Sequence, residues 1–334
     1  LYTRSISFRN FYSAGIHTNH GLYATLYSFP AMMKRNLMKG SVIPRYSGLP
    51  TVLKENGYYN LFFMTHEGQY DNMNAFFRTN GYDEVFSQED YPADKVVNSF
   101  GVQDDFLYDY AIPVLNQRAA TGQPFFATLL SISNHPPYVI PPFFHPKTSE
   151  PETQIVEYAD WALRQFFEEA RKQPWFDNTI FVLEGDHGKL VGDAECELPE
   201  SYNHIPLMIY SSRIQPEEKT TFGGQVDIQP TILGLLNIDY LQNNFGVDLL
   251  KEERPCMFYT ADNMVVGRND TLLYLYNYET QQELTYDIGN GKLNAVPMDD
   301  SFLPLKEYSF SMLQSAEFLV KHGKTLNSIP FTQQ

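Results

Sequence analysis

The chain has 334 residues, of which 43% are hydrophobic and 19% are charged, and this balance is typical of a globular protein rather than a disordered or fibrous one. Its formal net charge at pH 7 is −16, so it is not expected to bind a nucleic acid, because each backbone phosphate contact needs a cation. The length allows one large domain or two.

Cysteines and apolar runs exclude two further classes of protein. The two cysteines, Cys196 and Cys256, can form one disulfide or remain two free thiols, but they cannot build a disulfide framework or a cysteine-based zinc module. No apolar run approaches the roughly 18–20 residues of a membrane helix, and no signal peptide is recognisable.

The predicted elements alternate between strands and helices up to about residue 250. A polar cluster around Thr18 precedes an apolar stretch, which is typical of the start of a helix. Continuous apolar runs, which suit strands covered on both faces, lie at 60–66, 124–135, 179–187 and 205–210. Amphipathic helices are predicted at 156–170 and 228–236. This alternation predicts an α/β fold with a mainly parallel central sheet.

The pattern of polar and apolar residues changes after residue 250. Residues 271–277 and 282–289 carry polar and apolar residues more evenly and predict an antiparallel hairpin, and residues 309–322 predict a closing helix. We therefore expect a catalytic α/β domain over residues 1–250 and a small α+β subdomain over residues 251–334.

Three of the apolar runs end in side chains that can bind ligands. They end at His66, at Asn134-His135 and at Asp186-His187. Ligands of open α/β sheets bind beyond the carboxyl ends of the strands, so we expect these three segments to converge on one crevice. Each histidine alone could be an ordinary hydrogen-bonded loop residue; the three together favour a site.

The segment Glu184-Gly-Asp-His-Gly188 is the sharpest of these signals. A strand leads into a turn flanked by two glycines, where an acid and an imidazole can both face one metal ion. A carboxylate with an imidazole suits zinc or manganese. The alternative is an aspartate that caps a helix beside an ordinary histidine.

Thr18 has two possible roles. It could be the N-cap of the helix that follows it, or it could be a nucleophile. A hydroxyl of this kind needs a metal or a base to lower its pKa, and a metal held by Asp186 and His187 could supply that activation. Backbone N–H groups at the start of a helix can also hold a phosphate.

Six short pieces, in this order along the chain, resemble the extracytoplasmic catalytic domain of the lipoteichoic acid synthase family, in the alkaline phosphatase/sulfatase superfamily. These pieces lie at residues 11–18, 63–68, 131–138, 184–188, 204–210 and 226–233. The resemblance implies an alkaline-phosphatase-like fold and a metal-dependent phosphoryl-group transferase that acts on a phosphodiester, such as a phospholipid headgroup of the phosphoglycerol or phosphoethanolamine type.

The resemblance also implies roles for individual residues. Thr18 matches the catalytic threonine, which is also a metal ligand, and Asp186 and His187 match two further metal ligands. His135 matches a histidine that contacts the substrate and takes part in catalysis, and His66 matches another substrate-binding residue. The implied cofactor is one divalent metal, manganese or zinc. The implied substrate is a phospholipid or a glycan-linked molecule at the outer side of the bacterial cytoplasmic membrane, in the cell envelope.

Two departures from the family pattern affect this interpretation. The fourth metal ligand of the family is a glutamate on a strand before the threonine, and we expect that strand, together with the membrane anchor of the full-length protein, to precede Leu1. The tryptophan and arginine that the family places near the substrate are absent from residues 69–77 of this chain. The identity of the headgroup therefore stays open.

Three other functions are alternatives to this one. A sulfatase needs a cysteine or serine in a C/S-x-P-x-R motif, and the nearest match, Ser28-Phe-Pro-Ala-Met32, lacks the arginine. A phosphodiesterase of the same superfamily and a non-catalytic binding derivative are further alternatives, although the presence of Thr18, Asp186 and His187 argues against the latter.

His204 is a candidate ligand for a second metal ion. It stands at the amino end of the run 205–210, a position that favours a loop histidine outside the crevice. In related phosphoethanolamine transferases, however, a histidine before a similar Val-Pro run can bind a second zinc ion, and Asn203-His204-Ile-Pro206 has the matching form.

Overall fold

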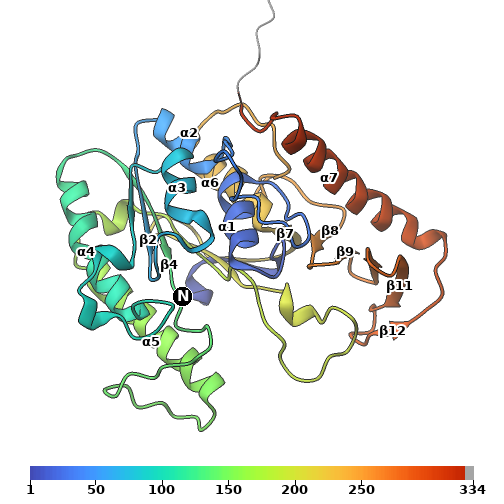
Figure 1. The fold of residues 1–334 in the computed structure, drawn as a ribbon, viewed down its shortest axis with the longest axis horizontal. Coiled ribbons are helices and arrows are strands. Elements are labelled where there is room, and N and C mark those ends of the chain that lie inside the picture. The colour runs from blue at the N-terminus through green and yellow to red at the C-terminus, as the bar shows by residue number, and fades with distance from the viewer. Residues whose placement is uncertain (328–334) are drawn as a thin grey trace, which may run out of the picture. The chain divides into compact units, whose positions relative to one another are not determined.

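The computed structural model describes residues 1–327, and Figure 1 shows their path. The chain forms two compact units: residues 1–49 together with the chain from residue 180 onward, and residues 50–179. Within the described part, no helix combines the length and the apolar character that crossing a membrane requires.

The unit of residues 50–179 is built on a three-stranded parallel sheet in the order β3-β2-β4. Its strands are β2 (Tyr59–Met64), β3 (Glu84–Phe86) and β4 (Phe125–Leu130). β2 and β4 confirm the strands predicted from residues 60 and 124. Met64 pairs with Leu130, so both strands end at the same edge of the sheet.

Helices cover this parallel sheet. They are α2 (Leu49–Glu55), which begins at the last residue of the other unit, α3 (Met73–Thr79), α4 (Asp104–Ala120) and α5 (Pro151–Ala170). α4 packs against β2, β4 and α5. α5 confirms the helix predicted over 156–170 and begins five residues earlier, because Pro151 suits the first turn of a helix.

The other unit contains a four-stranded sheet in the order β5-β6-β1-β7. Its strands are β1 (Ile6–Tyr12), β5 (Phe181–Glu184), β6 (Leu207–Tyr210) and β7 (Glu217–Gly224). β1 and β7 are parallel, whereas β6 runs antiparallel to both β1 and β5. An apolar run reports burial and not direction, so the sequence could not show that β6 is reversed.

Two helices accompany this sheet. α1 (Thr18–Tyr27) packs against α6 (Ile228–Leu235), which confirms the helix predicted at 228–236. The N-cap of α1 is His17, whose backbone is extended, so the capping role considered for Thr18 is wrong. Thr18 is instead the first residue inside the helix.

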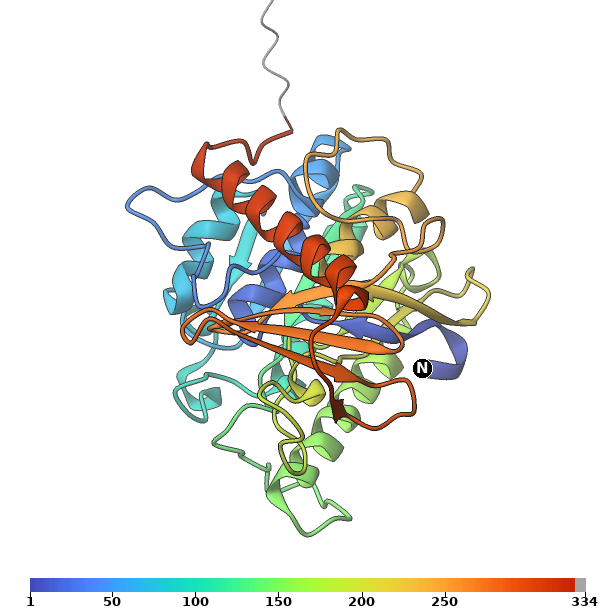
Figure 2. The ribbon, with the colours of Figure 1, turned by 90° about the vertical axis from the view of Figure 1, so that its right-hand side faces the viewer.

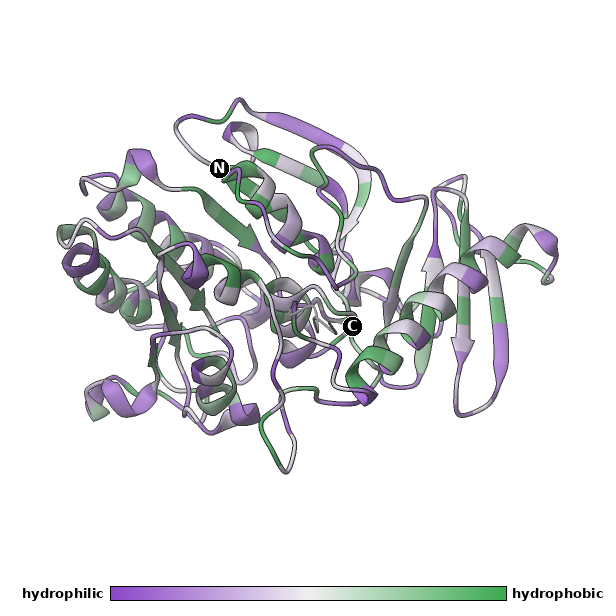
Figure 3. Ribbon diagram, turned by 90° about the horizontal axis from the view of Figure 1, so that it is seen from above, coloured by the Kyte–Doolittle hydropathy of each residue, from purple (hydrophilic) through white to green (hydrophobic). Residues whose placement is uncertain are grey.

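The end of the chain adds an antiparallel sheet of five strands and a long helix. The strands are β8 (Met257–Thr260), β9 (Met264–Arg268), β10 (Leu272–Asn277), β11 (Gln282–Asp287) and β12 (Asn294–Ala295). α7 (Leu303–Lys321) packs across β8, β9 and β10, as Figure 2 shows in orange and red. Hydrophobic and hydrophilic bands alternate along α7 in Figure 3, as expected for a helix with one buried face.

This C-terminal layer confirms the predicted hairpin and closing helix. β10 and β11 pair antiparallel, and the helix begins six residues before the predicted start. The sequence-based boundary at residue 250 coincides with this change of architecture, and a domain boundary there stays a prediction. Residues 328–334 of that predicted subdomain lie outside the described part. Cys196 and Cys256 are both free thiols.

Candidate active site

The turn that follows β5 carries an acid and an imidazole side by side. The side chains of Asp186 and His187 are 35% and 26% exposed, so both can be reached from outside. One carboxylate oxygen of Asp186, Oδ1, accepts a hydrogen bond of 2.9 Å from the backbone N–H of His187. The other, Oδ2, lies 3.6 Å from Nε2 of His187.

The geometry of this pair fits a metal ion. Nδ1 of His187 donates to the carbonyl oxygen of Gly188 over 2.7 Å, which leaves the lone pair of Nε2 available, as in most metal-binding histidines. Two ligands that each lie about 2.1 Å from one ion are roughly 3.0–3.4 Å apart, close to the observed spacing of Nε2 and Oδ2. No group of three His, Cys, Asp or Glu side chains able to hold a metal occurs in residues 1–327, so any further ligand must be a hydroxyl, water or substrate oxygen, or lie elsewhere.

Glu184, the last residue of β5, has a buried carboxyl. Burial raises the pKa of this carboxyl to about 8. The hydroxyl of Thr25 donates to its Oε1 over 2.5 Å. This hydrogen bond joins α1 to β5.

One face of α1 runs along this turn. Thr25 contacts Glu184, and Gly21, one turn earlier, is so close to Asp186 that a Cβ atom at Gly21 would overlap the carbonyl oxygen of Asp186. From Gly21 to Thr25 the helix rises about 6 Å, and two residues of extended chain, as from Glu184 to Asp186, span about 6.6 Å. The two segments therefore run antiparallel with similar spacing. Thr18 lies three positions before Gly21, on the same face of α1.

Two buried amides hold the loops of the site together. Oε1 of Gln225 accepts from the N–H of Ala14 over 2.9 Å, and its Nε2 donates to the carbonyl oxygens of Gly185 and Asp186 over 3.1 and 2.8 Å. Asn203 Nδ2 donates to Ser13 and Gly15 in the loop before α1. The loop that leads to Thr18 and the turn that carries Asp186 are therefore fixed to each other through Gln225.

The C-terminal layer also reaches this loop. Nε2 of His17 lies 2.6 Å from Oδ1 of Asp262, which stands between β8 and β9, and both side chains are about half exposed. Because His17 immediately precedes Thr18, this pair fixes the start of α1 from a segment 245 residues away.

In the other unit, His66 and His135 follow the carboxyl ends of the neighbouring strands β2 and β4, as predicted. A row of aromatic rings connects them. Ring centroids are 4.6 Å apart between His66 and Tyr70, 6.5 Å between Tyr70 and Phe100, and 4.0 Å between Phe100 and His135. The two histidines are therefore connected by a continuous row of aromatic rings.

His66 is the buried end of this row of rings. It is 1% exposed, and this burial lowers the pKa of its imidazole. Its Nδ1 donates to the carbonyl oxygen of Glu67 over 3.1 Å, and its Nε2 has no hydrogen-bond partner within residues 1–327. A buried polar atom without a partner is unusual in folded proteins and marks this position as a candidate functional one.

Asp104, at the start of α4, orients the loop of His135. Its Oδ1 accepts from the N–H groups of Ile132 and Ser133 over 2.9 and 3.0 Å, and it is 2% exposed. Burial raises the pKa of this carboxyl, and the two N–H groups oppose that effect. Nδ1 of His135 donates to the carbonyl oxygen of Pro136, so its Nε2 is left to face a ligand.

From its position at the amino end of the run 205–210, His204 is expected to lie away from the edge of the sheet where the other candidate residues gather. The structure places it at that edge. Because β6 is antiparallel, its amino end lies at the edge where β1 and β5 end, and His204 bridges Tyr12. Ile205 packs on Gly185, and adjacent side chains of a strand alternate, so the His204 ring points elsewhere. Its Nε2 is 2.7 Å from the carbonyl oxygen of Arg9, and its ring stacks on Tyr12. A second metal at His204 stays a prediction without a supporting ligand cluster in residues 1–327.

Ser28, the alternative nucleophile of the sulfatase interpretation, is fully buried. It forms the C-cap of α1, at the opposite end of a helix about 15 Å long from Thr18. Its backbone is left-handed, with φ of 55°, and it presents no reactive hydroxyl to a substrate.

Comparisons with known proteins agree with the resemblance seen in the sequence. The sequence model of the sulfatase family matches residues 1–238. Lipoteichoic acid synthase 1 of Bacillus subtilis is 26% identical over 270 residues, which are 74% of this chain and 40% of that protein. Phosphoglycerol transferase I of Xanthomonas campestris is 25% identical over 242 residues, which are 69% of this chain and 34% of that protein. The chain thus spans less than half the length of these relatives.

Solved structures share the fold. A protein of the alkaline phosphatase superfamily from Vibrio parahaemolyticus superposes with a TM-score of 0.87 at 26% identity, covering 97% of this chain and 81% of that one. The lipoteichoic acid synthase LtaP of Listeria monocytogenes superposes with a TM-score of 0.82 at 21% identity, covering 96% and 85%. The predicted alkaline-phosphatase-like fold is confirmed.

Proposed function

The chain belongs to the sulfatase family, and on that premise we propose that it is the catalytic part of a phosphoryl-group transferase that uses Thr18 as its nucleophile. The observation that carries this proposal is that Gly21 and Thr25, on the face of α1 that also carries Thr18, lie against Asp186 and Glu184. The names of the relatives, lipoteichoic acid synthase and phosphoglycerol transferase, favour a phosphodiester over a sulfate ester. The burial of Ser28 argues in the same direction.

Thr18, Asp186 and His187 would together hold a divalent metal, manganese or zinc. When bound, the metal would lower the pKa of the threonine hydroxyl and offset negative charge on the phosphate oxygens. The first turn of α1 adds backbone N–H groups beside the same oxygens. Gln225 and the His17–Asp262 pair keep Thr18 and Asp186 at a constant separation before the substrate arrives.

The reaction proceeds in two displacements at phosphorus. Oγ of Thr18 forms a bond to phosphorus as the bond to the lipid alcohol breaks, and that alcohol leaves with a proton. An acceptor hydroxyl, or water, then attacks the phospho-threonine, loses its proton and restores the threonine. His66 and His135, which follow β2 and β4, would contact the phosphate or its substituent.

The substrate proposed is a phospholipid headgroup or a glycan-linked phosphodiester at the outer face of the cytoplasmic membrane. The lipoteichoic acid synthase name of several relatives supports this setting, because it refers to a lipid-linked polymer. In this proposal the full-length protein carries a membrane anchor that brings the site to its lipid.

Mass spectrometry of Thr18 provides the direct test. The full-length protein is incubated with manganese and vesicles of phosphatidylglycerol, or separately of phosphatidylethanolamine, and the peptide that contains Thr18 is analysed for an added phosphoglycerol or phosphoethanolamine group. We expect one of these adducts, and its mass identifies the headgroup.

Two variants control this experiment. Thr18→Ser keeps a hydroxyl and should retain the adduct, whereas Thr18→Ala should lose both the adduct and turnover without loss of folding, because it removes little packing. Turnover that persists in Thr18→Ala would exclude Thr18 as the nucleophile.

A further inference from the structure

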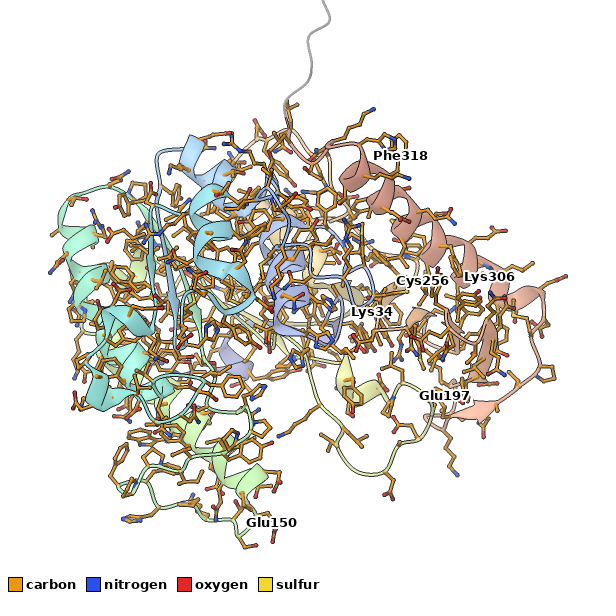
Figure 4. All side chains as sticks on the ribbon, in the orientation of Figure 1. Lys34, Glu150, Glu197, Cys256, Lys306 and Phe318 are labelled. Atoms are coloured by element: carbon orange, nitrogen blue, oxygen red, sulfur yellow. The ribbon has the colours of Figure 1, made fainter. Side chains whose placement is uncertain are left out.

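A cavity of about 330 Å³ lies in the unit of residues 1–49 and 180 onward, outside the residues assigned to the transfer reaction. One wall is the loop before β6, with Cys196 and Leu198, and the others come from the C-terminal layer, with Tyr259, Leu273 and Leu293. Figure 4 labels Glu197 on this loop, beside the C-terminal sheet. The hydroxyl of Tyr286 in β11 donates to Glu197 and fastens the loop to the sheet.

The floor of the cavity is formed by buried side chains. Leu198, Tyr259 and Leu273 are each less than a tenth exposed and belong to one hydrophobic cluster. The ring of Tyr259 stacks almost parallel on that of Tyr12, with centroids 5.5 Å apart and an interplanar angle of 5°. Because Tyr12 covers one face of the Tyr259 ring and Tyr259 is 4% exposed, the floor is closed, and a ligand would meet mainly the polar groups around it.

One side of the cavity is a fixed ion pair. The guanidinium of Arg268, whose side chain is 12% exposed, lies 4.9 Å above the ring of Tyr12 and binds Oε1 of Glu200. The same oxygen accepts from the hydroxyl of Tyr12 over 3.1 Å. Arg268 Nε has no hydrogen-bond partner within residues 1–327. These donors and acceptors are therefore positioned before any ligand enters.

The charges around the cavity cancel. Glu195 accepts from the backbone N–H of Glu200 over 3.1 Å, and the exposed Lys292 stands on the segment after β11. Two cations thus face two carboxylates, in a protein of net charge −16. An anionic ligand gains no net attraction here and meets the negative field of the whole molecule.

We propose that this cavity binds a neutral saccharide through the polar groups that line it. Each sugar hydroxyl is both a donor and an acceptor. The carboxylates of Glu195 and Glu200 and the cationic groups of Arg268 and Lys292 offer both kinds of partner around the cavity. A cavity of this size lies at the lower end of the range of small-molecule sites.

The site goes beyond the proposed transfer reaction and does not depend on it. It meets the candidate active site through Tyr12, the last residue of β1, six positions before Thr18. A saccharide bound here would be held on the C-terminal side of the catalytic loop, while Asp186 and His187 remain available.

Titration with neutral disaccharides tests the proposal. Maltose, lactose and cellobiose are added separately to the protein, and binding is followed by saturation-transfer NMR and calorimetry, with glycerol 1-phosphate as the anionic comparison. We expect at least one disaccharide to bind with a dissociation constant on the order of 1 mM, and glycerol 1-phosphate to leave that binding unchanged.

Three variants locate the binding. Leu293→Trp fills the cavity and should weaken binding at least tenfold, and Lys292→Ala, at an exposed side chain, should weaken it without affecting folding. Asn290→Trp, on the same segment but outside the lining, should bind as the parent does.

Thr18→Ala should also bind the saccharide as the parent does, which separates this proposal from the transfer reaction. Absence of binding by all three disaccharides at about 20 mM, undiminished binding by both cavity variants, or displacement of the sugar by glycerol 1-phosphate would overturn the proposal.

Discussion

Replacing Gly21 by alanine tests the arrangement of the candidate active site without touching a reacting group. Gly21 lies in the middle of α1, where alanine is the better helix former by about 1 kcal/mol. A Cβ atom at this position would overlap the carbonyl oxygen of Asp186, and it would lie 2.9 Å from Nε2 of Gln225 and 3.0 Å from the carbonyl carbon of Asp186. Two of these three neighbours are backbone atoms, which cannot rotate away.

The size of the effect follows from the distance that must open. Carbon atoms at normal contact lie about 3.5–4.0 Å apart, so α1 and the turn of Asp186 must separate by roughly 1 Å. Overpacking of this kind costs about 1–3 kcal/mol, and the gain in helix propensity offsets about 1 kcal/mol of it. A displacement of about 1 Å between nucleophile and activating group can lower turnover about 100-fold. We therefore expect a large loss of activity with a small loss of stability.

The assay compares Gly21→Ala with Gly234→Ala. Gly234 also lies inside a helix, α6, but a Cβ atom there would meet Oδ2 of Asp248 and Nζ of Lys251, which are the ends of flexible side chains. Turnover of phosphatidylglycerol and the urea midpoint are measured for both variants in the full-length protein. Gly234→Ala should retain nearly full turnover.

Full turnover in Gly21→Ala, with unfolding unchanged, would refute the reasoning, because it would show that the spacing of α1 and Asp186 does not control the reaction. Equal losses of activity in both variants would point to a general effect of alanine in these helices instead.

Three further predictions concern buried polar groups. Gln225→Leu removes the hydrogen bonds to Ala14, Gly185 and Asp186, and should lower the free energy of unfolding by about 2–4 kcal/mol and turnover at least tenfold; urea unfolding and activity assays should show both losses, and a change below 1 kcal/mol would contradict this role. Arg254→Ala leaves the fully buried carboxylate of Asp227 unpaired and should cost about 3–5 kcal/mol in the same unfolding assay, whereas a neutral effect would show that the pair is dispensable. Because burial lowers the pKa of His66, the unfolded state takes up a proton more readily, so stability should fall as pH drops below 6.5; the urea midpoint of His66→Gln should depend less on pH, and equal dependence would rule out this group as the cause.

The sequence by itself was sufficient to predict the elements that carry the candidate site residues. Apolar runs ending in His66, His135 and Asp186-His187 are strands β2, β4 and β5 with these residues just beyond them, because buried strands need continuous hydrophobic side chains and ligands gather at strand ends. The polar segment before Thr18 does lead into a helix. Such signals are local, so they can be read from neighbouring residues.

The direction of β6 could not be read in this way. An apolar run looks the same in both directions, and only pairing with β1 and β5 shows that His204 lies at the carboxyl edge of the sheet. The engagement of its ring by Arg9 and Tyr12 then depends on which side of the strand it faces.

The supporting residues of the site were also decided by the tertiary structure alone. Gln225 reaches back 211 residues to Ala14, and Asp262 reaches back 245 residues to His17. A single glutamine or aspartate in a loop carries no periodic signal, and its partner is chosen by the packing of whole elements. The sequence therefore determined which residues could perform the chemistry, whereas the tertiary structure decided which buried hydrogen bonds hold them in place, because those bonds join segments that meet only after the chain has folded.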